Sequence, residues 1–371
     1  MISFGPSEEQ EVVRDAMREF ATEVFREAAR EADEASALPA GLLEQVWELG
    51  LTSTQLPEAY GGGGEVRSPV TNAILLEELA YGDPALAIAS TAPSFFAFAI
   101  NAFGTEAQKQ AYLPAFCGDK FAAATVAVAE PSPVFDIANL QTTAEAKEGG
   151  FVLSGKKHFV VLGDQAKHFL VLARENQAAS AGLDAIDAFI VPRDAAGLTI
   201  SEVQKNLGMK ALPTVELVLE NVEVASEARL GGEAGIDAAR LIAQMRTASA
   251  ALRVGLSRAV MEYAIPYAKD RHAFGEAIAQ KQAIAFMLSD MQIEVNSMRW
   301  LTWKAAATLE SLEDATRPAI FASTYTAEQA MKIADNGLQV LGGHGFIREH
   351  PVELWYRAAR TLTVLDAVAA V

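Results

Sequence analysis

The sequence predicts a multidomain α and β fold, with an N-terminal helical domain, a central antiparallel β-barrel or sandwich domain, and a C-terminal four-helix bundle. Apolar residues recur at helical spacing up to about residue 120. Short runs of β-branched and aromatic residues between turn signals then continue to residue 224. Long amphipathic patterns resume near residue 235, so we expect domains at 1–120, 121–230 and 231–371.

The helical character of the first domain is marked by its start signals. Ser7 followed by Gln10 forms one capping box, and Thr105 followed by Gln108 forms a second. The stretch 85–103 carries no charge and has the length of a membrane span. Because Pro93 and several hydroxyl residues interrupt it, we expect a buried helix pair beside an apolar pocket instead.

The central domain is defined by short runs that are typical of strands. Glycine pairs, Gly155 and Pro192 punctuate these runs as turn signals. The expected strands are 123–128, 151–153, 158–162, 168–172, 188–191, 215–219 and 222–224.

The C-terminal domain is predicted from two apolar faces at helical spacing. One face belongs to a helix near the start of the domain and consists of Leu241, Met245, Ala248, Leu252 and Leu256. A later helix has the face Ile284, Met287, Met291 and Val295. Long helices of this kind joined by short turns indicate a bundle, and Pro266 is expected to kink the first of them.

Charge and cysteine content exclude several classes of protein. The chain has 30 Lys+Arg against 48 Asp+Glu, a formal net charge of -18, which excludes a basic surface for nucleic acid or for membrane lipids. Cys117 is the single cysteine, so neither a disulfide framework nor a multi-thiolate zinc site can form within the chain. The acidic first residues do not resemble a signal peptide, and we expect a cytoplasmic protein without membrane insertion.

Motifs for nucleotides and metals are absent or weak in the sequence. Neither a P-loop nor a GxGxxG turn after a strand is present. His344 and His350 flank Glu349, but six residues is not a usual ligand spacing. We expect no metal site.

Several segments together resemble the acyl-CoA dehydrogenase family of flavoproteins. Each matches one motif of the family, and they occur along the whole chain in the family's order. The segments are the Pro-Glu-x-Tyr-Gly-Gly loop at 57–62, the helical connector at 104–114, the Glu130-Pro131 turn, 206–210 with 215–224, RxxFGxxIxxxQ at 271–282, and QxxGGxG followed by PxE at 339–353.

The resemblance implies a fold and a chemistry. The family has a helical domain, a β domain and a four-helix bundle, usually in a tetramer. Its members bind FAD and remove two hydrogens from Cα and Cβ of an acyl-CoA thioester, and the electrons pass to an electron-transfer flavoprotein. A carboxylate takes the α-proton, and an apolar slot holds the acyl chain. Phe95, Phe96 and Phe98 could line that slot, although core packing is the expected role.

The catalytic base implied by the resemblance falls on Asp366. This side chain is one methylene shorter than the family's Glu, and it is followed by Ala-Val in place of Gly-Thr. The family's alternative base position falls on Met245, which cannot accept a proton, and Arg246 beside it matches a substrate-binding arginine. Asp366 is therefore either the base or a surface acid without a role.

The half of the flavin site that the family builds from a subunit's own β domain is altered here. Ala129 and Val161 stand where the family has threonines near the flavin ring. Residues 132–136 read Ser-Pro-Val-Phe-Asp where the family has a Gly-rich phosphate turn, and Pro133 also removes an N–H donor. Binding of FAD by this half should be weak, because each charge-assisted hydrogen bond to phosphate contributes roughly 1.5–3 kcal/mol.

The half that the family supplies to a neighbouring subunit is retained. The resemblance assigns cofactor binding to Arg271, Phe274, Gln282, Gln339, Gly342 and Gly343. An alternative is that these residues persist because they pack the bundle interface.

The combination predicts a flavin-poor subunit of a heteromeric, α2β2 acyl-CoA dehydrogenase, resembling actinobacterial pairs that act on bulky, steroid-like acyl-CoA esters. This chain would complete the FAD site of a homologous partner. Two alternatives remain: a self-sufficient homotetramer that uses Asp366 as its base, and a non-catalytic CoA-ester-binding or scaffold protein of the same fold.

Overall fold

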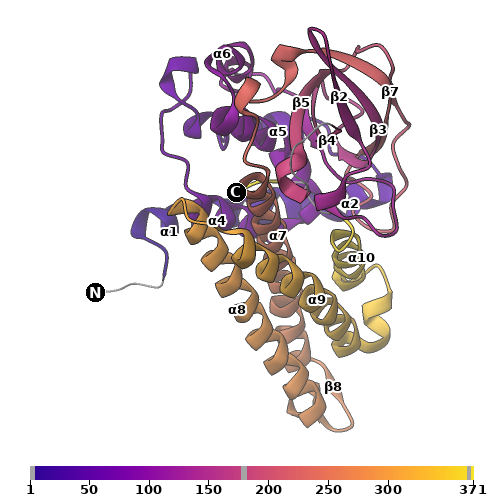
Figure 1. Cartoon of the computed structure of the whole chain (residues 1–371). Coiled ribbons are helices and arrows are strands. Elements are labelled where there is room, and N and C mark those ends of the chain that lie inside the picture. Colours follow the sequence, from indigo (N-terminus) through magenta and orange to yellow (C-terminus); the bar gives the residue numbers. More distant parts are fainter. Residues whose placement is uncertain (1–4, 177–181, 366–368) are drawn as a thin grey trace.

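The fold is described by a computed structural model that covers residues 5–176, 182–365 and 369–371. Helices come first, a β domain follows, and a helical bundle completes the chain, so the predicted fold class is confirmed. Figure 1 shows the bundle extending away from the β domain, with the strand β8 at its far end. The helices are α1 (Glu8–Phe20), α2 (Glu27–Ala35), α3 (Leu42–Trp47), α4 (Pro69–Gly82), α5 (Pro84–Phe103), α6 (Glu106–Tyr112), α7 (Ala238–Asp270), α8 (Gln282–Glu310), α9 (Thr316–Leu341) and α10 (Val352–Leu362).

The N-terminal helices begin where their capping residues predict. The side chains of Ser7 and Thr105 accept hydrogen bonds from the N–H groups of Gln10 and Gln108, which complete both capping boxes. The stretch expected to be a helix pair is instead one continuous helix, α5, with Pro93 inside it. Among the described residues α5 alone has the length and apolar composition of a membrane span, yet 78% of its apolar window is buried inside the protein. It is a core helix.

The β domain is a mixed sheet of seven strands. Its order is β1-β4-β2-β3-β7-β6, and β5 pairs with β4. Most pairs are antiparallel as predicted, but β4 runs parallel to both β1 and β2. The strands are β1 (Ala124–Ala127), β2 (Thr143–Lys147), β3 (Gly150–Val161), β4 (His168–Glu175), β5 (Ile186–Pro192), β6 (Leu198–Ile200) and β7 (Thr214–Ala225).

Two expected strand breaks are irregularities within longer strands. The runs 151–153 and 158–162 belong to β3, and 215–219 and 222–224 belong to β7. The register of β3 against β7 shifts on either side of Gly155, so this glycine bends the strand and does not end it. A Cβ at Gly155 would lie 2.6 Å from Thr142, which explains the glycine.

The bundle packs on the N-terminal helices through a close crossing of α4 and α7. Gly255 allows it, because a Cβ there would lie 2.1 Å from the carbonyl oxygen of Glu77. The same crossing holds a buried ionic cluster. Arg258 Nη1 donates to Glu77 at 2.6 Å and to Glu78 at 2.8 Å, and Arg299 and Arg18 reach the same two carboxylates at 2.6 and 3.0 Å. α1, α4, α7 and α8 are thus joined by ion pairs in which Glu77, Glu78 and Arg258 are buried, while Arg18 is partly exposed.

One face of α8 is apolar and exposed. Phe286, Ile293 and Trp300 are 61%, 60% and 50% exposed, and their spacing of seven residues places them on one side of the helix. We call these three residues the α8 stripe.

Candidate functional site

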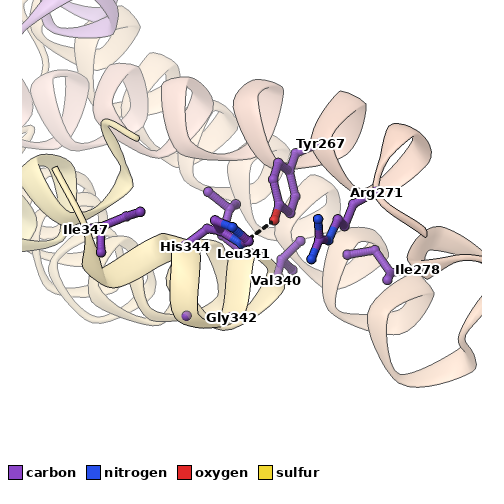
Figure 2. Close-up of a pocket in the computed structure, with 9 residues that line it drawn as sticks. Tyr267, Arg271, Ile278, Val340, Leu341, Gly342, His344 and Ile347 are labelled. Atoms are coloured by element: carbon purple, nitrogen blue, oxygen red, sulfur yellow. Dashed lines mark hydrogen bonds between the residues drawn. The ribbon is translucent and has the colours of Figure 1, made fainter. Parts of the chain in front are cut away.

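A hollow of about 500 Å³ lies at the far end of the bundle, between the end of α7 and the end of α9. Figure 2 shows the Tyr267 hydroxyl directed at His344, with Arg271 beside Tyr267. Its lining consists of Tyr267, Arg271, Ile278, Val340, Leu341, Gly342, Gly343, His344 and Ile347.

Arg271 is positioned by the end of α7 and by a short hairpin. Its N–H donates to Tyr267 O at 2.9 Å, and its carbonyl accepts from Ile278 N at 2.8 Å. The hairpin pairs β8 (His272–Ala273) with β9 (Glu276–Ala277), and its turn places Phe274 and Gly275 at φ angles of 56° and 89°. No carboxylate within the described ranges pairs with the guanidinium of Arg271. The hollow therefore contains an uncompensated cation.

Two glycines form the opposite wall of the hollow. Gly342 ends α9 with φ 59°, a backbone conformation that favours glycine. A Cβ at Gly342 or Gly343 would meet nothing within 4 Å, so the backbone here is open to a ligand. An open glycine backbone opposite a free guanidinium fits the diphosphate of a dinucleotide.

The remaining predicted cofactor residues surround the hollow and do not line it. Phe274 is 96% exposed, and Gln282 and Gln339 are also exposed. The structure thus brings Arg271, Gly342 and Gly343 to one hollow, and the other three residues are exposed outside its lining.

Two tyrosine–histidine contacts near the hollow were not predicted from the sequence. Tyr267 Oη lies 3.2 Å from His344 Nδ1, and Tyr263 Oη lies 2.8 Å from His350 Nδ1. Over the ranges that the structure covers, no three His, Cys, Asp or Glu side chains gather into a metal site. The two histidines bind tyrosine hydroxyls.

The altered flavin half in the β domain differs from this hollow in the packing of its residues. Val161 is 3% exposed, and Val134 in the replaced phosphate turn is 85% exposed. Glu130 of the Glu-Pro turn is occupied by structural contacts, because it accepts Gln141 N at 2.7 Å, Thr142 N at 2.8 Å and Lys157 Nζ at 3.0 Å. Burial lowers the pKa of Lys157 to about 8, although Glu130 opposes the shift. These residues do not fit a dinucleotide.

The acyl side of the expected site is nearly filled. Phe95, Phe96 and Phe98 are all at most 3% exposed, in agreement with core packing. Ala369, Ala370 and Val371 are buried as well, at 1%, 7% and 0%. A hollow beside Phe98 and Ala370 has a volume of about 30 Å³, close to the volume of one water molecule. It is lined by Leu51, Asn72, Leu75, Leu76, Leu79, Thr91, Ser94, Phe98 and Ala370.

The predicted catalytic residues are only partly described. Asp366 lies outside the described residues, so its role stays a prediction. Arg246 is half-buried on α7, and Met245 beside it is buried in the same apolar cluster as Phe98 and Ala370.

Arg67 is a half-buried arginine with buried guanidinium atoms that the sequence did not reveal. Its Nε and Nη2 atoms are buried without a hydrogen bond, and Cζ lies 4.3 Å from the centroid of the Phe98 ring. Burial, assisted by Arg240, lowers the pKa of Arg67 to about 9.

We expect Arg67→Met to raise the free energy of unfolding by about 1–3 kcal/mol in urea titrations, because it removes unsatisfied buried donors. Arg240→Met should instead lower the free energy of unfolding, because Arg240 has a hydrogen bond to lose: it donates to Leu309 O at 3.1 Å. A loss of stability in the Arg67 variant would contradict this account.

Comparisons with known proteins cover the whole fold. Three family models match: Acyl-CoA dehydrogenase, N-terminal domain, at residues 7–120, its middle domain at 125–222, and its C-terminal domain at 235–366. The chain is 30% identical to 3-(aryl)acrylate reductase of Clostridium sporogenes (strain ATCC 15579), over 98% of this chain and 96% of that protein. It is 31% identical to the mitochondrial short-chain specific acyl-CoA dehydrogenase of Bos taurus, over 98% and 87%. The solved structure of butyryl-CoA dehydrogenase from Megasphaera elsdenii superposes with a TM-score of 0.87 at 27% identity, over 100% of this chain and 96% of that one.

Proposed function

This chain belongs to the acyl-CoA dehydrogenase family of FAD-dependent oxidoreductases, and from that premise we propose that it completes the FAD site of a homologous partner subunit. When bound, FAD is the oxidant that accepts the hydrogens removed from the acyl group. The role of this chain is to bind the diphosphate and adenosine end of the partner's FAD.

The unpaired guanidinium of Arg271 is the observation that carries the proposal. It lines, together with the open backbone of Gly342 and Gly343, a hollow large enough for part of a dinucleotide. Arginine binds phosphate through two parallel N–H donors, and these donors are available only when no carboxylate already pairs with the guanidinium. The exposure of Phe274, Gln282 and Gln339 around the hollow supports a site that a second chain closes.

The chain's own β domain supports the same division of labour. Val161 is packed into the core, and the segment that replaces the phosphate turn carries Pro133 and an exposed Val134. Without those N–H and hydroxyl donors, the flavin ring and the first phosphate belong in the partner's β domain.

The acyl group is also assigned to the partner. The hollow of about 30 Å³ beside Phe98 and Ala370 is too small for an acyl chain, which supports binding of a bulky, steroid-like group in the partner's cleft. Proton abstraction is then the task of the partner's carboxylate, not of Asp366. An electron-transfer flavoprotein is the proposed electron acceptor, and the cytoplasm is the proposed location.

The visible absorption spectrum tests the proposal. The chain purified alone should be colourless, and co-expression with a family member that has an intact β-domain flavin half should give one flavin per two chains. One flavin per chain in the lone protein would instead support a homotetramer that uses Asp366, and no flavin in any assembly would support a scaffold protein.

Asp366→Asn separates the first two outcomes by activity. Dehydrogenation by the co-expressed assembly should be unchanged, because the base belongs to the partner. Loss of activity in this variant, with flavin retained, would assign catalysis to Asp366.

A further inference from the structure

We propose that His344 binds the phosphate of the dinucleotide together with Arg271, and that Tyr267 is a positioning residue that fixes the proton of His344 on Nε2. The inference rests on the proposed function of the hollow and adds two residues that the family motifs do not assign.

The two side chains converge on the hollow from different elements. Tyr267 lies in the last turn of α7, and Arg271, the residue that ends the helix, donates its backbone N–H to Tyr267 O at 2.9 Å. His344 directly follows the glycine wall formed by Gly342 and Gly343. Figure 2 shows the Tyr267 hydroxyl directed at the imidazole of His344, with Arg271 beside them.

The contact between Tyr267 and His344 determines which imidazole nitrogen can donate. The tyrosine hydroxyl lies 3.2 Å from Nδ1. Either atom of this pair could be the donor. We assign the donor role to the phenol, whose O–H is more acidic than a neutral imidazole N–H, and the neutral imidazole then carries its hydrogen on Nε2. Within the part of the chain that the structure describes, Nε2 of His344 has no hydrogen-bond partner. It is a free donor at the wall of a hollow whose other donor is the Arg271 guanidinium.

An anion is the ligand chemistry that these donors suit. A guanidinium fork and a neutral N–H together can bind the oxygens of one phosphate group. Tyr267 makes no direct contact in this account. It acts through His344, by preventing the tautomer in which Nε2 would be an acceptor facing a phosphate oxygen.

A second pair of the same type provides a matched control. Tyr263 is one turn earlier on α7, and its hydroxyl lies 2.8 Å from His350 Nδ1. Neither Tyr263 nor His350 lines the hollow. The ring of Tyr263 packs at 5.7 Å from Trp355, and the carbonyl of His350 accepts from Arg30. Tyr263→Phe therefore makes the same chemical change in the same aromatic cluster, away from the ligand.

The experiment measures the dissociation constant of FAD for the flavin-containing assembly of this chain, by the recovery of flavin fluorescence on dilution. Tyr267→Phe and His344→Phe should each weaken binding by about tenfold, the effect of losing one hydrogen bond of about 1.4 kcal/mol. Tyr263→Phe should change it less than about twofold. In the His344→Gln background, where an amide N–H donates without a tautomer, Tyr267→Phe should have no further effect.

Two outcomes would overturn the inference. Equal losses in Tyr267→Phe and Tyr263→Phe would show that the hydroxyls stabilise the aromatic cluster and not the ligand. An unchanged dissociation constant in His344→Phe would show that the imidazole does not bind FAD. If Arg271→Ala weakens FAD binding while His344→Phe does not, only this inference is wrong. If neither variant has an effect, the proposed function of the hollow is wrong as well.

Discussion

Arg271→Ala is expected to weaken FAD binding to the assembly by about 100-fold or more. Arg271 is the one guanidinium that lines the described hollow, and it has no carboxylate to compete with a phosphate. Two charge-assisted hydrogen bonds of roughly 1.5–3 kcal/mol each are lost together, which exceeds the 2.7 kcal/mol that corresponds to about 100-fold. The measurement is the flavin retained per chain after gel filtration, with the dissociation constant from fluorescence.

Two further variants define what the loss means. Arg271→Lys keeps the charge but not the planar fork, so it should recover only part of the affinity. Arg348→Ala removes an arginine whose side chain is 64% exposed and pairs with Glu34 outside the hollow, so flavin content should not change. Full flavin retention in Arg271→Ala would rule out a role of this residue in FAD binding.

Arg258→Met is expected to lower the free energy of unfolding by about 3–5 kcal/mol, the usual cost of removing one partner from a buried ionic group. Glu77 and Glu78 would lose the cation that they share at the crossing of α4 and α7. Glu262→Gln is the matched control, because Glu262 contacts the same arginine from a side chain that is 41% exposed. It should cost less than about 1 kcal/mol in the same urea titration.

The effect of Arg258→Met should depend on pH. Burial acts to raise the pKa of Glu78, but hydrogen bonds and charge from Arg258 and Arg18 outweigh burial and lower it below 4.5. A carboxylate with a lowered pKa stabilises the fold above its unfolded pKa, and that contribution is lost as the pH falls through the folded value. The difference between wild type and variant should therefore be full at pH 7 and shrink in acid. An equal difference at pH 7 and in acid would show that lost packing, not charge, causes it.

The order of helices, sheet and bundle could be predicted from the sequence because it depends on local signals. The capping boxes at Ser7 and Thr105 are short-range patterns, and both are present in the structure. β2 was missed because Thr-Ala-Glu-Ala-Lys consists mostly of residues that are rare in strands, and only its pairing with β3 and β4 stabilises it. Gly155 was interpreted as a break because its contact with Thr142 is not visible in the sequence.

Part of the site could be predicted because its residues belong to short motifs that are visible in the sequence. The motifs that contain Arg271, Gly342 and Gly343 were recognised one by one, and the ends of α7 and α9 bring them together. The contact between Tyr267 and His344 spans 77 positions and exists only because these helix ends pack. The position of Tyr267 four residues before Arg271 indicates that Tyr267 lies near the site, but this spacing alone does not identify a residue that binds or positions a ligand.

The exposed Phe274 has a consequence for the degradation of this protein in the cell. A fully exposed phenyl ring on a hairpin tip, together with the α8 stripe, is the kind of surface that chaperones and proteases recognise on orphan subunits. Under the proposed function, a copy synthesised without a partner subunit should be degraded, so the partner's rate of synthesis would set the steady-state amount of this chain. Pulse-chase labelling with and without the partner measures this directly, and equal half-lives would show that the surface is tolerated. A shorter half-life without the partner would mean that quality control keeps the two subunits in balance without any regulation of their genes.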